Sequence, residues 1–131
     1  MELSARSRKE IGALGESVAM EYLRRRGMQL VGRNITRKTG ELDVIACEDD
    51  LLHIVEVKTL VTNEFPRTQD AEDVYDPSAN LHAYKIRKVA RTAEWYVQDS
   101  GWEGDWQVDG CLVWLRRRDG KALVRFFPHI A

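Results

Sequence analysis

The chain opens with apolar residues that recur every three or four positions. The stripe is formed by Ile11, Leu14, Val18 and Tyr22, and it is widened by Ala19 and Leu23. Because this spacing places side chains on one face of a helix, it predicts an amphipathic helix over residues 7–26. Gly27 follows as a stop signal, and the arginines at 24–26 suit a helix C-terminus, where cations offset the helix dipole. The three arginines therefore have a structural explanation beside a DNA-binding one.

The rest of the chain alternates short apolar runs with polar segments. The runs predict strands at residues 28–33, 41–48, 51–59, 107–115 and 122–127. A second helical pattern covers residues 80–98, and its expected core face consists of Ile86, Val89, Ala90, Ala93 and Tyr96. The order αβββαββ predicts a single α/β domain over residues 1–131, with helices flanking a mixed central sheet.

Two stretches between these elements are polar. Residues 35–40 are expected to link two strands. Residues 60–79 contain two prolines and many acidic side chains, and we expect them to form a long exposed loop. Loops of this length in compact domains are often functional.

Composition places the chain among ordinary globular proteins. Its 131 residues are 44% hydrophobic and 31% charged, and no apolar run approaches the roughly 20 residues of a membrane span. Cys47 and Cys111 lie in apolar runs without metal-ligand spacing. We expect them to be small buried side chains, with a disulfide or a metal site as the alternative. A reducing cytoplasm is the corresponding expectation for localisation.

The net charge of −1 conceals an uneven distribution. Residues 1–40 carry a net +5, residues 41–80 a net −9 and residues 81–131 a net +3. This arrangement can place metal-binding carboxylates between phosphate-binding arms. Solvated surface charge is the alternative explanation.

The most informative segment is the pair of predicted strands on either side of residues 49–50. If these residues form the centre of the turn, the antiparallel register places Asp43 directly opposite Glu56, and Glu41 opposite Lys58. Directly opposed side chains in a sheet have Cβ atoms roughly 4.5–5.5 Å apart. Because alternate residues share a face of a strand, Glu56 and Lys58 point the same way.

The apolar neighbours make this charged cluster unusual. Both strands carry apolar residues on both faces, as buried strands do. Facing carboxylates in such a place repel each other and lose hydration, and a divalent cation such as Mg²⁺ or Mn²⁺ would remove that cost. Lys58 would then orient or activate a water, or neutralise phosphate charge. The alternative is a buried ionic cluster of Asp43, Glu56, Lys58 and Glu41, although its excess of negative charge favours a metal.

The two predicted helices add further candidates. Glu16 borders the apolar stripe of the first helix and can lie partly inward, with an exposed position as the alternative. Lys85 projects from the core-facing side of the second helix, either towards a metal-phosphate centre or simply out to solvent. The opposite face of that helix carries Tyr84, Arg87, Lys88, Arg91 and Trp95. A basic and aromatic face can contact a nucleic-acid backbone, or it can merely be solvated.

These residues carry a resemblance to a known family. The matching segments are Gly15-Glu16-Ser17-Val18-Ala19, Arg33-Asn34, Gly40-Glu41-Leu42-Asp43-Val44-Ile45-Ala46 and Val55-Glu56-Val57-Lys58, with weaker matches at Lys85 and at Val108-Asp109. Together they resemble the YraN family of small bacterial proteins, which is similar to archaeal Holliday-junction resolvases. The resemblance covers most of residues 10–60 and implies a restriction-endonuclease-like domain of the PD-(D/E)XK superfamily.

The resemblance also implies roles for individual residues. Asp43 and Glu56 would bind Mg²⁺ or Mn²⁺, joined by the Val57 carbonyl. Lys58 would be the catalytic lysine, and Glu16 an auxiliary acidic residue on the first helix. The predicted nucleic-acid contacts are Arg33, Lys85, Lys88 and Arg91.

The sequence departs from the family pattern in two places. Thr59 stands where relatives usually have arginine, which removes one expected phosphate contact. Residues 61–78 are unusually acidic and match the family poorly, so access to the site or substrate preference is expected to differ.

Taken together, these features predict a Mg²⁺- or Mn²⁺-dependent nuclease, or a nuclease-like binding protein, that acts on structured DNA. The alternatives are a nucleic-acid-binding module with little hydrolysis and a protein-interaction domain in which the carboxylates are structural. Junction resolvases act as dimers, so a homodimer is expected by analogy. No membrane partner is expected.

Overall fold

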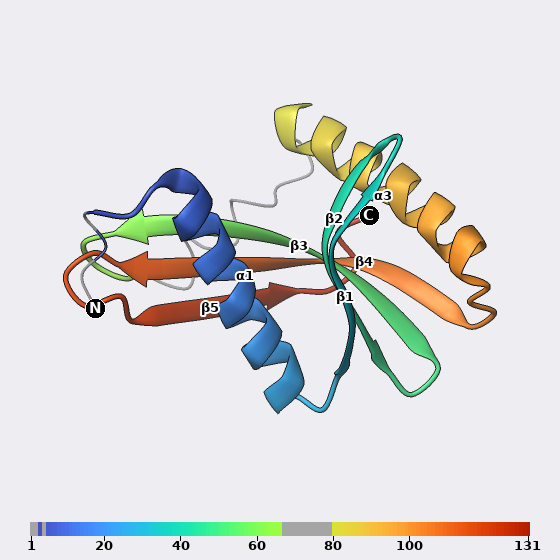
Figure 1. The fold of residues 1–131 in the computed structure, drawn as a ribbon, viewed down its shortest axis with the longest axis horizontal. Coiled ribbons are helices and arrows are strands. Elements are labelled where there is room, and N and C mark those ends of the chain that lie inside the picture. The colour runs from blue at the N-terminus through green and yellow to red at the C-terminus, as the bar shows by residue number, and fades with distance from the viewer. Residues whose placement is uncertain (1–2, 4, 67–79) are drawn as a thin grey trace.

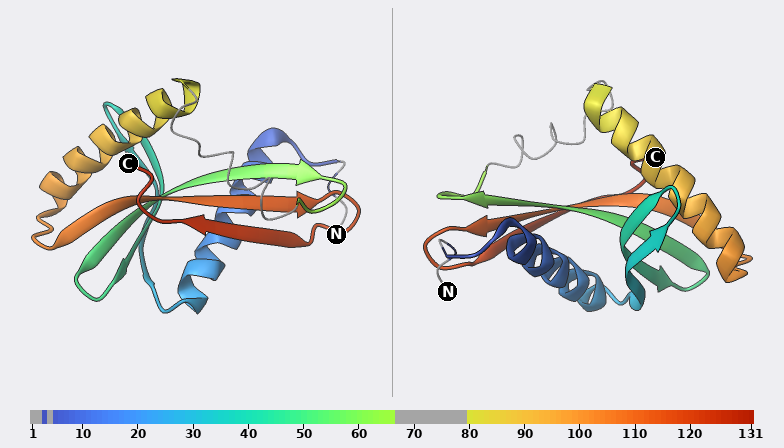
Figure 2. Two further views of the ribbon diagram at one scale, coloured as in Figure 1. Left: turned by 180° about the vertical axis from the view of Figure 1, so that it is seen from behind. Right: turned by 45° about the horizontal axis from the view of Figure 1, so that its top comes forward.

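A five-stranded mixed sheet with one helix on each face forms the described part of the chain (Figures 1 and 2). The computed structural model describes residue 3, residues 5–66 and residues 80–131, and only the backbone of residues 80–83. The helices are α1 (Arg8–Arg25) and α3 (Asn80–Ser100), and the strands are β1 (Gln29–Arg37), β2 (Gly40–Glu48), β3 (Leu51–Thr62), β4 (Asp105–Arg116) and β5 (Ala122–Phe127).

The strands follow one another across the sheet in chain order, β1-β2-β3-β4-β5. Only β3 and β4 are parallel, and the other neighbouring strands are antiparallel. Parallel neighbours need a long crossover connection, which α3 provides. The predicted α/β class, the order αβββαββ and the mixed sheet are confirmed.

Helix α1 begins at a capping box. Ser7 Oγ accepts from the Glu10 N–H at 3.1 Å, and Glu10 Oε1 accepts from the Ser7 N–H at 3.3 Å. The buried residues of this helix are Gly15, Ala19 and Leu23, so its core face is centred on the side of the predicted stripe that Ala19 and Leu23 widen. The other four residues of the predicted stripe flank these positions and are partly buried. Small residues at the centre let α1 approach the sheet closely.

Strand β1 is longer than predicted. It takes in residues 35–37 of the expected polar link over residues 35–40, and Gly40 begins β2, because β1 and β2 pair as far as Arg37 and Gly40. Only Lys38 and Thr39 are left in the turn. An edge strand exposes alternate side chains to water, so polar residues here do not prevent strand formation.

Strand β3 is also longer than predicted, and it shortens the expected acidic loop. Its parallel ladder with β4 continues to the pair Thr62 and Arg116, so residues 60–62 belong to the strand rather than to the loop. Residues 63–66 are described without helix or strand, and the rest of the predicted loop lies outside the described residues.

The core lies in two layers, one on each face of the sheet. The first packs α1 against Val44, Ala46, Val55, Cys111, Val113 and Leu115. The second packs α3, through Val89, Ala93 and Val97, against Ile45, Ile54 and Val108. Val89 and Ala93 confirm the predicted core face of the second helix, whereas Val97 was not predicted. None of the helices in the described part of the chain has the length and apolar character needed to cross a membrane.

The two cysteines are free, so the disulfide alternative does not apply. Cys111 is fully buried, and burial raises the pKa of its thiol to about 12. Cys47 is half-buried. The prediction of small buried side chains is thus confirmed for Cys111 and only partly for Cys47.

A buried polar network closes the end of the sheet near the C-terminus. Asp109 is fully buried, and its Oδ2 lies 2.5 Å from His53 Nδ1. Its Oδ1 accepts from Gln107 Nε2 at 2.7 Å and from the His129 N–H at 3.0 Å. A buried carboxylate needs such hydrogen-bond partners. Asp109 therefore has a structural role, because it anchors the C-terminal segment to β4.

Candidate metal centre

The candidate site lies where β2 and β3 separate. Their antiparallel ladder runs from the pair Glu48 and Leu51 to the pair Val44 and Val55, in the predicted register, and ends there. The expected Asp43–Glu56 pair is therefore one step beyond the last ladder pair. In place of the ladder, Asp43 Oδ2 accepts a hydrogen bond from the Val57 N–H at 2.9 Å.

The two carboxylates at this point are close enough to influence each other. Glu56 is 8% exposed, and Asp43 is half-buried. Burial, and then the charge of Glu56, raise the pKa of Asp43 to about 7, although the Val57 N–H opposes the shift. The charged form of Asp43 is thus disfavoured in the metal-free protein, and a bound cation would favour it.

Lysine side chains from two elements line the same groove as Glu56. Lys85 on α3 lies with its Nζ 3.0 Å from Glu56 Oε1, while 63% of its side chain stays exposed. Lys58, two residues after Glu56 on β3, is half-buried and makes no ion pair with any described residue. The ionic cluster in which Lys58 pairs with Glu41 does not form, because the β2–β3 ladder ends before reaching them.

Glu16 approaches the site from α1, as predicted. Burial and then the charge of Asp43 raise its pKa, while Arg33, whose Nε lies 3.5 Å from Glu16 Oε1, opposes the shift. The side-chain amide of Asn34, in the orientation that satisfies its surroundings, donates to Glu16 Oε1 and to Glu41 Oε1, each at 3.1 Å. Asn34 has a φ of 52°, a conformation that asparagine adopts more readily than most residues.

Arg33, which was predicted as a nucleic-acid contact, lies between β1 and α1. Its Nη2 donates to the Ala13 carbonyl at 2.9 Å, and its guanidinium faces Glu16. The structure therefore gives Arg33 a role in holding β1 to α1. Asn34 and Glu41 also border the site. The strand register had already placed Glu41 in this region, whereas the only sequence signal for Asn34 was its place in the motifs that carry the family resemblance.

The residues present fit a divalent cation in a limited way. Within the described ranges, no group of three or more His, Cys, Asp or Glu side chains is close enough to hold a metal ion. The Asp43–Glu56 pair supplies two carboxylates, and Mg²⁺ commonly takes one or two carboxylates and completes its shell with water and substrate phosphate. In an antiparallel strand, the N–H and the carbonyl of one residue point towards the same neighbouring strand. The Val57 N–H points towards Asp43 on β2, so the Val57 carbonyl also faces the gap between β2 and β3.

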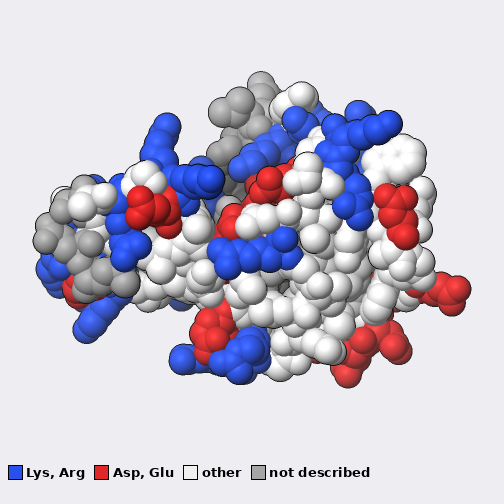
Figure 3. Space-filling model, viewed as in Figure 1, with Lys and Arg blue, Asp and Glu red and all other residues white. Residues whose placement is uncertain are grey.

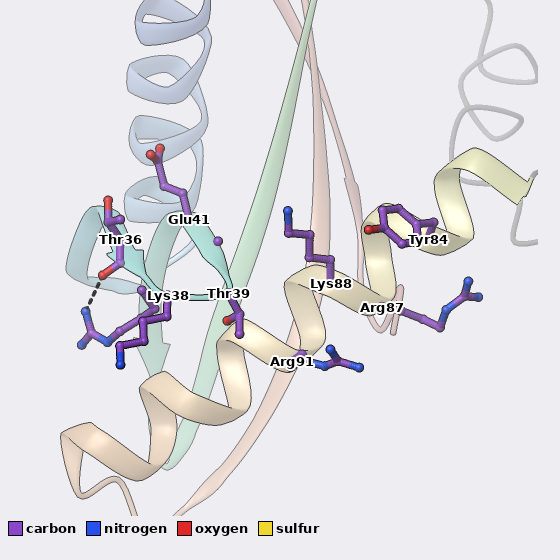
Figure 4. A pocket seen from close by; sticks show the side chains of 10 residues that line it. Thr36, Lys38, Thr39, Glu41, Tyr84, Arg87, Lys88 and Arg91 are labelled. Atoms are coloured by element: carbon purple, nitrogen blue, oxygen red, sulfur yellow. Dashed lines mark hydrogen bonds between the residues drawn. The ribbon is translucent and has the colours of Figure 1, made fainter.

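A groove gives access to this centre. The site groove, of about 480 Å³, lies between β2, β3 and α3, and its lining includes Glu41, Glu56, Lys58, Lys85 and Lys88. It adjoins a second groove of about 590 Å³ between the β1–β2 turn and α3, here called the basic groove (Figure 4). The cationic residues of the basic groove are Arg37, Lys38, Arg87, Lys88 and Arg91.

The basic groove contains both predicted and unpredicted residues. Lys88 and Arg91 were predicted as nucleic-acid contacts and lie in it, and Lys85 lies in the site groove. Arg37 and Lys38 were not predicted, because residues 35–40 had been interpreted as a polar link. In Figure 3, basic side chains gather over the upper part of α3 and the neighbouring turn, with acidic side chains beside them.

The fold and site together define a small α/β protein with a pair of carboxylates, one buried and one half-buried, and an adjoining basic groove. The family model described as "Uncharacterised protein family UPF0102" matches residues 15–121, and the chain belongs to this family. It is the YraN family that the sequence motifs resemble.

Individual relatives cover most of the chain. A UPF0102 protein of Syntrophotalea carbinolica is 35% identical over 123 residues, which are 92% of this chain and 90% of the relative. One from Mycolicibacterium vanbaalenii is 35% identical over 113 residues, 86% of each chain. One from Campylobacter jejuni strain RM1221 is 34% identical over 98 residues, 75% of this chain and 78% of the relative.

Proposed function

We propose that this protein is a Mg²⁺- or Mn²⁺-dependent nuclease that hydrolyses phosphodiester bonds in structured DNA. The observation that carries the proposal is the pair of half-buried Asp43 and buried Glu56, where burial and then the charge of Glu56 raise the pKa of Asp43 to about 7. Full ionisation of this pair costs free energy, and a bound divalent cation would offset that cost.

Each residue of the centre has a role in this proposal. Asp43 and Glu56 hold the cation, with the Val57 carbonyl facing the same gap. When bound, the cation would polarise a phosphoryl oxygen and lower the pKa of a bound water. Lys58, without an ion-pair partner in the described part of the chain, is available to orient that water or to stabilise charge on the phosphate. Glu16, next to Asp43, adds a further acidic side chain to the centre.

Cleavage of defined DNA forms tests this function. Hairpin, flap and four-way-junction DNA would be incubated with wild-type protein and Mg²⁺ or Mn²⁺. We expect metal-dependent products, which disappear in Asp43→Asn and Lys58→Ala while both variants keep their circular-dichroism spectrum. Lys121→Ala, an exposed lysine in the β4–β5 connection, is the matched control and should cleave like wild type. Folded wild-type protein that cuts no form in either metal would refute the proposal.

A nucleic-acid-binding module without hydrolysis is the second candidate. One observation favours it: Lys85 Nζ already lies 3.0 Å from Glu56 Oε1, where a metal ligand is required. This candidate predicts salt-sensitive binding without product, since neutralising phosphates releases counterions.

A further inference from the structure

The basic groove has a wall that is fixed in place by side-chain contacts. The β1–β2 turn is held against α3 by the hydroxyls of Thr39 and Thr92, which lie 2.8 Å apart. On the same side, Arg37 Nε lies 3.4 Å from Asp99 Oδ2, and its guanidinium stacks over the Tyr96 ring at 5.5 Å. Since three contacts join the turn to the helix, the groove is a preformed feature rather than a space between independent segments.

The cations of the groove are largely unused within the protein. Lys38, Arg87, Lys88 and Arg91 are exposed, and no carboxylate of the described residues lies within ion-pair distance of them. In Figure 4, Lys88 projects from α3 towards the side of β2, whereas Arg87 and Arg91 extend in another direction from the same helix. Glu41 is the one acidic residue among the described residues that line this groove, and the Asn34 amide binds it. The groove is therefore suited to an anionic chain.

Two exposed aromatic residues border the cations. Tyr84 is 63% exposed and Trp95 is 52% exposed, which is unusual for side chains of this size. They lie eleven positions apart on α3, about 16 Å along the helix axis. Tyr84 lines the basic groove, and Trp95 lines a smaller hollow beside it, together with Arg37, Lys38 and Thr39.

We infer that the basic groove binds a single strand of nucleic acid, with phosphates on Arg87, Lys88 and Arg91 and bases stacked on Tyr84 and Trp95. Interleaved cations and aromatic rings are the combination that single-strand sites use, because every unstacked base has a face for a ring. In a duplex those faces are occupied by neighbouring bases. The basic groove shares Gly40, Glu41, Tyr84 and Lys88 with the site groove, so the bound strand leads to Glu56 and Lys58. Only the path of the bound strand to Glu56 and Lys58 rests on the proposed nuclease function; strand binding in the groove does not depend on it.

Strand binding can be measured separately from cleavage. Fluorescence anisotropy would be recorded in EDTA with Asp43→Asn protein and labelled 15-nucleotide strands of DNA and of RNA, beside a blunt duplex of equal length. We expect the single strand to bind at least tenfold more tightly than the duplex, and the DNA and RNA arms show which sugar is preferred. Equal affinity for strand and duplex would overturn the inference, whatever the cleavage assay gives.

Variants then separate the two kinds of contact. In a plot of log affinity against log salt concentration, each phosphate contact to a single strand contributes about 0.7 to the magnitude of the slope. The double variant Arg87→Ala with Arg91→Ala should therefore reduce that magnitude by roughly 1.4. Trp95→Ala should weaken single-strand binding by roughly five- to hundredfold, the range for loss of one stacked base, whereas Trp95→Phe should keep most of it.

A charge-matched control is available at the far end of α1. Arg24→Ala with Arg25→Ala also removes two positive charges, at a helix end that lies away from the β1–β2 turn (Figure 1). This control should bind like the parent protein. If it loses as much affinity as the groove variant, binding is a net-charge effect and the groove is not the site. If the protein cleaves DNA but shows none of the expected binding results, the proposed nuclease function would hold and the basic groove would have no part in it.

Discussion

The Asp43 carboxylate takes the place of a main-chain partner, because its Oδ2 accepts the Val57 N–H at 2.9 Å just beyond the last β2–β3 ladder pair. The separation of two adjacent strands thereby brings an acidic side chain, a main-chain carbonyl and the neighbouring Glu56 to one gap. Helix α1 contributes Glu16 to this place and α3 contributes Lys85.

Asp43→Asn should stabilise the metal-free protein at neutral and alkaline pH. The pKa of Asp43 is raised from 3.8 to about 7, so its contribution to stability is fully present below pH 4 and is lost as the pH rises through 7. Asparagine keeps an acceptor for the Val57 N–H but carries no charge. We expect the free energy of unfolding of Asp43→Asn to exceed that of wild type by roughly 1–2 kcal/mol at pH 8. A three-unit pKa shift corresponds to about 4 kcal/mol, and the expected difference is smaller because the side chain is only partly buried.

Urea unfolding in EDTA at pH 4 and at pH 8 measures this difference. The two proteins should be nearly equal at pH 4 and diverge at pH 8. Asp50→Asn removes the same charge from the exposed β2–β3 turn and is the control, with a change under about 0.5 kcal/mol at either pH. An Asp43→Asn protein that is less stable than wild type at pH 8 would show that Asp43 is not electrostatically strained.

Lys85→Met should strengthen Mn²⁺ binding. Lys85 Nζ lies on Glu56 Oε1 and competes with a cation for that oxygen. Because most of the lysine side chain is exposed, the ion pair contributes at most about 1 kcal/mol, so its loss should raise metal affinity by up to roughly fivefold. Isothermal titration with Mn²⁺ gives the value, with Lys88→Met as the control. Weaker Mn²⁺ binding in Lys85→Met than in Lys88→Met would mean that Lys85 supports the metal site.

Much of the fold could be predicted because its signals are local. A turn centred on the acidic residues at 49–50 predicted the strand register, which holds for each of the five ladder pairs from Glu48 and Leu51 to Val44 and Val55. The helical periodicity near residues 7–26 and 80–98 likewise gave both helices close to their bounds.

The errors arose where a tertiary partner decides the outcome. The sequence of residues 35–37 and 60–62 has no clear preference for a strand. Residues 35–37 are strand because they pair with β2, and residues 60–62 are strand because they pair with β4. For the same reason, Arg37 and Lys38 could not be assigned to a groove before the position of the β1–β2 turn against α3 was known. The ion pair between Lys85 and Glu56 joins two elements 29 positions apart in the chain, and only its general location was predictable.

Gly15→Ala should destabilise the protein through the contact between α1 and β3. A Cβ at this position would lie 1.8 Å from Thr59 Oγ1 and 2.8 Å from Thr59 Cβ, so the helix or the strand must move. We expect a loss of roughly 1–3 kcal/mol, as for overpacked cores. Gly12→Ala is the matched control: nothing lies within 4 Å of its Cβ, and the higher helix propensity of alanine should stabilise it by up to about 1 kcal/mol.

Chemical denaturation of both variants provides the measurement. Adding Thr59→Gly to Gly15→Ala removes the clashing side chain and should recover part of the loss. Equal stability of Gly15→Ala and Gly12→Ala would contradict the close approach of α1 to β3 and, with it, the position of Glu16 beside Asp43.

The most direct test of the Asp43–Glu56 centre is a thermal-shift measurement with Mn²⁺ and Mg²⁺ on wild type and Asp43→Asn. A ligand that binds only the folded state at a hundred times its Kd stabilises by about 2.7 kcal/mol. We therefore expect the Tm of wild type to rise by roughly 5–10 °C, and that of Asp43→Asn by under about 1 °C. A wild-type Tm that ignores both metals, or an Asp43→Asn protein that responds as strongly as wild type, would contradict a metal centre at this pair.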